Sequence, residues 1–122
     1  MICWFEIPVI DMKRAIAFYE SVFAFHIKHH NFGTTEMALI SKKDEKLKDI
    51  GALVLNKEHY LPNSSEGILI FFESSNLQKE MNLIEKSGGT ILRPKTQINE
   101  ELGFMGLFLD SEGNRIGLRS IN

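Results

Sequence analysis

The sequence has a single cysteine, Cys3, so an internal disulfide is excluded. Cys3 stands in an expected strand among apolar neighbours, and we interpret it as a small buried hydrophobic side chain. No apolar run approaches the roughly 18 residues that a membrane-spanning helix requires. The N-terminus also lacks the pattern of a secretory signal. We therefore expect a cytoplasmic protein that does not enter a membrane.

The sequence also has no large excess of positive or negative charge. Fourteen basic and 16 acidic residues leave a formal net charge of −2, which gives no electrostatic reason to expect nucleic acid or an anionic membrane as partner. The 122 residues, with 43% hydrophobic and 25% charged side chains, have the composition of an ordinary globular protein. This length is enough for one domain with a real core, and we expect a single domain over residues 1–122.

The stretch 4–23 predicts a strand followed by an amphipathic helix. Apolar and β-branched residues precede Pro8, which lacks a backbone N–H and therefore suits the end of a strand. Asp11 is a good N-cap because its carboxylate can accept a hydrogen bond from an unpaired N–H of the first turn. Apolar residues at helical spacing then predict one buried face, formed by Met12, Ala15, Ile16, Tyr19, Val22 and Phe23.

The remaining elements follow from similar patterns. Asn76 is expected to cap a second helix over 77–87, which Gly88-Gly89 would end in the left-handed conformation. The Pro-, Asn- and Ser-containing segment 56–66 is expected to link two halves of the chain. Gly106, inside a strand, indicates a bulge or a close approach of the backbone to another group. Further strands are predicted over 25–30, 36–41, 50–55, 68–73, 90–93, 104–109 and 115–120.

The two halves repeat one pattern of elements at a constant offset of 65 residues. This offset relates the caps Asp11 and Asn76, places Leu69 on Trp4, and places segment 50–55 on 115–120. Few residues are identical, so the order of strands and helix is what repeats. We predict an α+β fold of two βαβββ modules, about 2–55 and 67–121, that form a curved mixed sheet around a shared cavity.

Two motifs resemble a known family. Residues 4–25 (WFEIPVIDMKRAIAFYESVFAF) resemble the opening of the glyoxalase/bleomycin resistance/dioxygenase, or vicinal oxygen chelate, superfamily. Residues 110–118 (DSEGNRIGL) resemble its closing D-P-x-G-N-x-I-x-L hairpin, with Ser111 in place of proline. The resemblance spans the chain and is strongest for the lactoylglutathione lyase-related subgroup. It implies the glyoxalase-like fold but no particular chemistry, since the superfamily includes lyases, isomerases, dioxygenases, thiol transferases and drug binders.

The resemblance also implies where a metal would bind. Active members hold a divalent ion with four ligands, two from each module, usually His, Gln or Glu. Three of these positions fall on Trp4, Leu69 and Gly117, and the fourth falls on Ala52 or, in an alternative register, on Gly51. None of these side chains offers a donor suited to such an ion. We therefore expect no metal and no other cofactor.

Glu6 is the candidate catalytic residue. Trp4 and Glu6 share a strand face, because side chains alternate along a strand. A carboxylate in an apolar cavity has a raised pKa and could act as an acid or base. The alternative is that Glu6 pairs with Arg119 or Arg115 and only shapes the pocket.

The histidines do not favour a relocated metal site, because His26 and His30 would lie about 13 Å apart along one strand.

These residues predict a metal-free binder of an apolar or aromatic small molecule. The alternative is a lactoylglutathione lyase-related enzyme, a lyase or isomerase that uses Glu6 as its base. By resemblance the protein is expected to be a homodimer. Its modules could pair within one chain or by swapping, and the short linker favours pairing within the chain. The expected ligand-binding residues are Trp4, Glu6, Leu69, Phe71 and Arg119.

Overall fold

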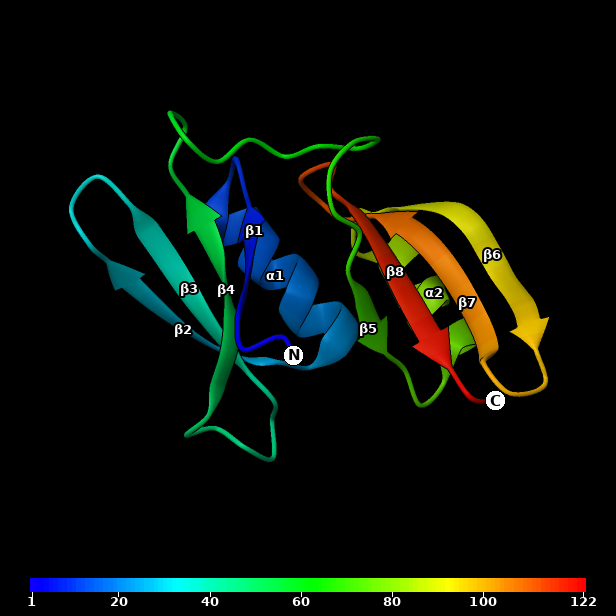
Figure 1. The fold of residues 1–122 in the computed structure, drawn as a ribbon. Helices are drawn as coiled ribbons and strands as arrows, with labels where there is room; N and C mark the ends of the chain where they lie inside the picture. Colours follow the sequence, from blue (N-terminus) through cyan, green and yellow to red (C-terminus); the bar gives the residue numbers. More distant parts are fainter. The chain divides into compact units, whose positions relative to one another are not determined.

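A computed structural model describes all 122 residues. The chain divides into two compact units, Met1–Pro62 and Asn63–Asn122. The boundary between the units lies within the predicted linker, segment 56–66. Each unit runs strand, helix, strand, strand, strand (Figure 1). The two helices have 12 and 10 residues, and neither has the length and apolar character needed to cross a membrane.

The first unit is a four-stranded mixed sheet with one helix on one face (Figure 1). The strand order is β1-β4-β3-β2, and β1 runs parallel to β4 while the other neighbours are antiparallel. A parallel pair needs a crossover connection, and α1 lies in that crossover. The elements are β1 (Phe5–Pro8), α1 (Met12–Phe23), β2 (His26–Asn31), β3 (Glu36–Ser41) and β4 (Asp49–Leu55).

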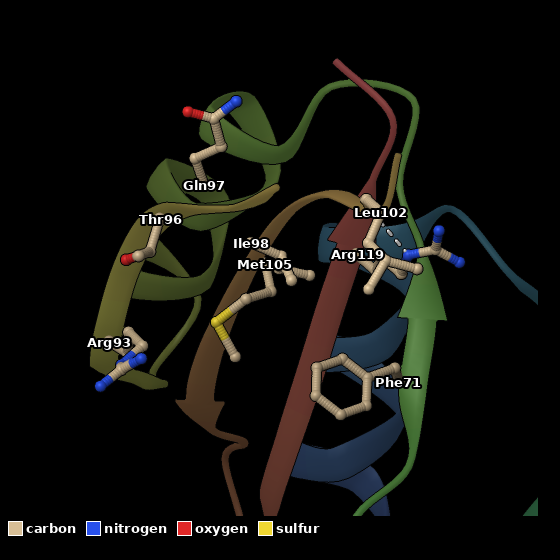
Figure 2. A pocket seen from close by; sticks show the side chains of 8 residues that line it. All are labelled: Phe71, Arg93, Thr96, Gln97, Ile98, Leu102, Met105 and Arg119. Atoms are coloured by element: carbon tan, nitrogen blue, oxygen red, sulfur yellow. Dashed lines mark hydrogen bonds between the residues drawn. The ribbon is translucent and has the colours of Figure 1, made fainter. Parts of the chain in front are cut away.

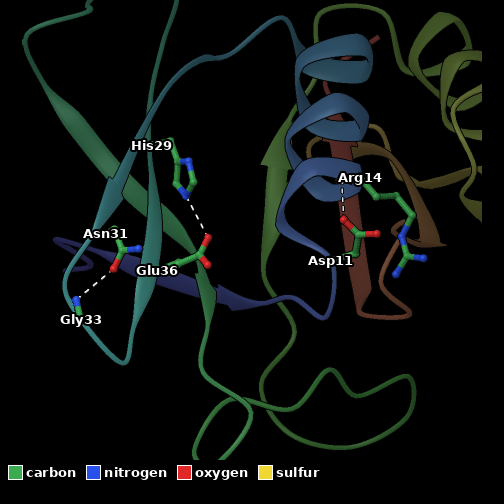
Figure 3. Close-up of polar contacts among 6 residues, drawn as sticks. All are labelled: Asp11, Arg14, His29, Asn31, Gly33 and Glu36. Carbon is green, nitrogen blue, oxygen red and sulfur yellow. Dashed lines mark hydrogen bonds and ion pairs between the residues drawn. The ribbon is translucent and has the colours of Figure 1, made fainter.

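The predicted cap of α1 is confirmed, and its predicted buried face is confirmed in part, because Ile16 and Phe23 are only half-buried. The Asp11 carboxylate accepts a hydrogen bond from the Arg14 backbone N–H at 3.1 Å (Figure 3). The helix ends at Ala24, which has the left-handed φ of 53°. Burial of a large apolar side chain stabilises a fold by about 1.5–3 kcal/mol. The buried face includes Phe18, which the predicted spacing left out, and consists of Met12, Ala15, Phe18, Tyr19 and Val22.

The core of the first unit fixes which side chains lie on each face of its sheet. Ile7 pairs with Leu53, and both are at most 2% exposed, as are Ala38 and Ile40 on the same face. Because side chains alternate, Glu6 and its partner across the pair, Ala52, lie on the opposite face.

The second unit has the same topology, with the strand order β5-β8-β7-β6. Its first strand is shorter than predicted, because residues 68–70 are not in a strand. Its edge strand continues past Pro94 to Asn99, so the expected end at residue 93 is wrong. The pairing of β6 with β7 is irregular between Arg93 and Thr96, and a proline at an edge irregularity costs little. The elements are β5 (Phe71–Glu73), α2 (Leu77–Lys86), β6 (Thr90–Asn99), β7 (Gly103–Leu109) and β8 (Arg115–Ser120).

Helix α2 is capped and ended as its sequence predicts. The Asn76 side chain accepts a hydrogen bond from the Lys79 N–H at 3.1 Å. At the other end, Gly88 has a φ of 103°, as expected for a left-handed cap. The close approach inferred for Gly106 is also found, because a side chain there would collide with Met81 of α2. Gly106 therefore lies on the sheet face that α2 covers.

The strand register confirms the 65-residue repeat. Glu6 pairs with Ala52 in the first unit, and the residues 65 positions later, Phe71 and Gly117, pair in the second. The α+β fold of two βαβββ modules is thus confirmed, with the strands divided between two four-stranded mixed sheets. The expectation for Cys3 is wrong. Cys3 is exposed and lies before the start of β1.

Candidate ligand-binding site

The second unit contains a cavity of about 600 Å³ on the face of its sheet opposite α2 (Figure 2). All four strands contribute to its lining, together with the turn between β6 and β7. The lining residues are Phe71, Arg93, Thr96, Gln97, Ile98, Leu102, Met105 and Arg119.

Strand alternation explains how residues distant in sequence meet at this cavity. Gly106 faces α2, so its neighbour Met105 faces away from the helix. Met105 pairs with Arg119 on β8, and Phe71 on β5 pairs with Gly117, two residues before Arg119. Phe71, Met105 and Arg119 therefore share one face of the sheet, and Figure 2 shows them around one space.

The ring of Phe71 lies against β8 because Gly117 has no side chain. A Cβ atom at Gly117 would lie 2.8 Å from Cγ of Phe71 and closer still to other ring atoms. The Phe71 side chain is nevertheless 45% exposed. An exposed aromatic ring held on a rigid sheet offers apolar area that a ligand can cover.

Two arginines are the only charged residues that line the cavity. The Arg119 Nε donates a hydrogen bond to the Leu102 carbonyl at 2.9 Å, which joins β8 to the β6–β7 turn. Arg93 lies at the opposite edge, on β6 (Figure 2). The nearest acidic residue in the register is Glu73, the strand partner of Arg119, which lines an adjoining pocket of about 180 Å³.

The first unit holds a second polar cluster around Glu6. One carboxylate oxygen of Glu6, Oε1, accepts a hydrogen bond from the Tyr60 hydroxyl at 2.6 Å. The other oxygen accepts a longer bond of 3.3 Å from the Trp4 indole N–H. The bond to Glu6 and its negative charge raise the pKa of the Tyr60 hydroxyl above its usual value of 10.0. Sequence reasoning missed Tyr60, because it lies in the linker and nothing local pairs it with β1.

The predicted ligand-binding residues are thus distributed over both units. Phe71 and Arg119 line the cavity of the second unit. Leu69 is half-buried just before β5 and is not a lining residue. Trp4 and Glu6 are exposed neighbours in the first unit. Their roles in binding stay predictions. Four further lining residues were not predicted from the sequence: Arg93, Ile98, Leu102 and Met105. They come together only through the contact between β6 and β7, which local sequence patterns do not show.

The side chains at the positions implied for a metal do not fit one. Ala52 and Gly117 carry no donor atom, and their strand partners are Glu6 and Phe71. Neither unit contains a group of three His, Cys, Asp or Glu residues able to hold an ion. His29 instead pairs with Glu36, with Nε2 and Oε2 separated by 3.0 Å (Figure 3). His30 stacks on Phe32 with ring centroids 5.9 Å apart.

Two βαβββ units, one with a cavity of small-molecule size, define the class of this protein. A model of the Glyoxalase/Bleomycin resistance protein/Dioxygenase superfamily matches residues 2–118, and the chain belongs to that superfamily. No curated protein matches the chain in sequence.

Solved structures with the same fold include members of different kinds. TnmS3, an antibiotic binding protein from Streptomyces sp. CB03234, is 20% identical with a TM-score of 0.65, over 98% of this chain and 94% of its own. A glyoxylase/bleomycin resistance protein/dioxygenase domain from Frankia sp. EAN1pec is 13% identical, with a TM-score of 0.78 over 98% and 96% of the two chains. Glyoxalase I from Zea mays is 18% identical with a TM-score of 0.71 over 98% of this chain but 45% of its own. The present chain therefore spans less than half the maize enzyme. At these identities the likeness shows the fold and does not resolve a subgroup.

Proposed function

We propose that this protein binds an apolar or aromatic small molecule without the help of a metal. The observation that carries the proposal is the cavity of about 600 Å³. Ligand sites commonly have volumes of roughly 300–1,000 Å³, mostly apolar walls and a few polar groups that orient the ligand. Phe71, Ile98, Leu102 and Met105 would form such walls. Trp4, Glu6 and Leu69 are proposed as further ligand-binding residues.

The comparison with TnmS3 supports this proposal without identifying a ligand. That protein has the same fold and is described as an antibiotic binding protein. The proposal that no metal is needed is supported by the side chains at the expected ligand positions, because Ala52 and Gly117 carry no donor atom. The binding energy would come from removing apolar surface from water, at about 25 cal/mol per Å².

Fluorescence titration with the neutral aromatic dye N-phenylnaphthylamine tests the binding proposal. Phe71→Ala removes the exposed aromatic wall and is expected to weaken binding about twofold to tenfold, since aromatic ring contacts are worth about 0.5–1.5 kcal/mol. Phe32→Ala is a matched control, because Phe32 is 60% exposed in the other unit and outside the cavity. Equal affinity for the wild type and Phe71→Ala, or no dye binding at all, would contradict the proposal.

A second candidate function is that of a lactoylglutathione lyase-related enzyme, a lyase or isomerase with Glu6 as base. The specific observation in its favour is the 2.6 Å bond between Glu6 and the Tyr60 hydroxyl, which orients a carboxylate with a proton donor beside it. The test is formation of lactoylglutathione from methylglyoxal and glutathione. Activity that Glu6→Gln abolishes and Glu36→Gln leaves unchanged would favour the enzyme over the binder.

We further propose that residues 1–122 act as one domain and that the protein is a cytoplasmic homodimer. Light scattering at micromolar concentration is expected to give twice the chain mass of 13.9 kDa. A mass of one chain would refute the dimer without affecting the cavity of the second unit, which one chain forms by itself.

A further inference from the structure

We propose that the ligand carries an anionic group, of the carboxylate or sulfonate type, and that Arg93 binds this group at the β6 edge of the cavity. This inference rests on the proposed binding function and deepens it by naming the charge of the ligand. It makes Arg93 the residue that selects anionic over neutral ligands.

The charge of the lining residues is the first argument. Among the eight side chains that line the cavity, two are cationic and none is acidic. The other polar members, Thr96 and Gln97, are neutral. A cavity with apolar walls and cationic edges complements a ligand with an apolar body and a negative group at one end.

The hydrogen bonds that each arginine already makes indicate which of the two binds the anionic group. Arg119 already donates its Nε hydrogen to the Leu102 carbonyl and stands beside Glu73 across the strand pair. The bond to Leu102 uses one of the N–H donors of this guanidinium. Arg93 makes no side-chain hydrogen bond or ion pair, and its guanidinium lies at the opposite edge of the cavity (Figure 2). Its fork of N–H donors is therefore free to bind a planar carboxylate or a sulfonate.

A pair of dyes separates the charge from the aromatic body. Anilinonaphthalene sulfonate carries a sulfonate on nearly the same ring system as the neutral N-phenylnaphthylamine. Dissociation constants for both dyes are measured by fluorescence for the wild type, Arg93→Gln and Lys95→Gln. Lys95 is a matched control, since it lies on the same strand outside the cavity lining, over the ring of Phe104, and its loss changes the net charge equally.

We expect Arg93→Gln to weaken sulfonate binding about threefold to tenfold, as for a charge-assisted hydrogen bond at a partly exposed site. Binding of the neutral dye should change by less than about twofold, because its apolar contacts remain. Added salt should weaken sulfonate binding in the wild type more than in Arg93→Gln. Lys95→Gln should leave the ratio of the two constants unchanged.

The outcomes distinguish the two proposals. If the neutral dye binds and Arg93→Gln affects the sulfonate no more than Lys95→Gln does, the role of Arg93 is refuted while the binding function stands. If neither dye binds to the wild type, the binding function itself fails. Arg119→Gln should weaken both dyes, because the bond that holds the β6–β7 turn is lost. If Arg119→Gln weakens binding of the sulfonate dye but not of the neutral dye, and Arg93→Gln affects neither, the anionic group binds at Arg119 instead.

Discussion

Adding one methyl group at Gly117 should close part of the cavity while the protein remains folded. In Gly117→Ala the new Cβ atom would lie 2.8 Å from Cγ of Phe71 and nearer to other atoms of the ring. The nearest atoms all belong to this one side chain, which is 45% exposed. The ring can therefore swing towards the solvent and into the cavity. We expect a loss of stability at the lower end of the about 1–3 kcal/mol typical of overpacking.

The assay combines a thermal melt with titration of N-phenylnaphthylamine. A loss of about 1 kcal/mol corresponds to a decrease in Tm of roughly 3–6 °C for a chain of this size. Dye affinity should fall about tenfold, because the displaced ring removes a wall and occupies space that the ligand needs. Wild-type affinity in Gly117→Ala would refute the assignment of Phe71 as a wall of the binding site.

Gly51→Ala provides the matched control. A Cβ atom at Gly51 would lie 2.7 Å from atoms of the Phe5 ring, again an aromatic side chain across a parallel strand pair. Phe5 is half-buried, on the face of the sheet that carries Ile7 and Leu53, and its ring has less room to move. We expect a larger decrease in stability, about 2–3 kcal/mol, with dye affinity unchanged in the folded protein.

Three further predictions concern Tyr60, Cys3 and the metal. The raised pKa of Tyr60 means that the fold binds its proton more tightly than the unfolded chain does, so this contribution to stability is complete below pH 10 and is lost as pH rises through the folded pKa. Spectrophotometric titration should therefore show phenolate forming at lower pH in Glu6→Gln, and an unchanged titration would contradict the bond. Cys3 should react with a thiol reagent in the native protein at nearly the rate of the unfolded chain, since it is exposed. Elemental analysis after dialysis should find no stoichiometric zinc or nickel, and one equivalent lost on mutation of Glu6 would show that the ligand positions were assigned wrongly.

Local patterns in the sequence predicted the order of the helices and strands, although β5 is shorter and β6 longer than these patterns indicate. Asp11 and Asn76 cap helices because a side-chain oxygen three residues before a backbone N–H is a short-range arrangement. The two caps are 65 residues apart, and the same offset relates the other elements of the two halves, which reveals the repeat. Strand alternation then predicts that Trp4 and Glu6 share a face. The absence of donor atoms at Ala52 and Gly117 is likewise a property of the sequence once the repeat is known.

The tertiary structure alone decided which side chains meet at the sites. Glu6 and Tyr60 are 54 residues apart, and only the path of the linker brings the hydroxyl to the carboxylate. Thr96 and Ile98 reach the cavity because β6 continues as an edge strand past Pro94, where an irregular pairing tolerates the missing N–H. Contacts of this kind depend on long-range packing, which periodicity within a short window does not encode. The fold and its repeat therefore follow from the sequence. The cavity, and the place of the Arg93 guanidinium at its edge, follow from tertiary packing.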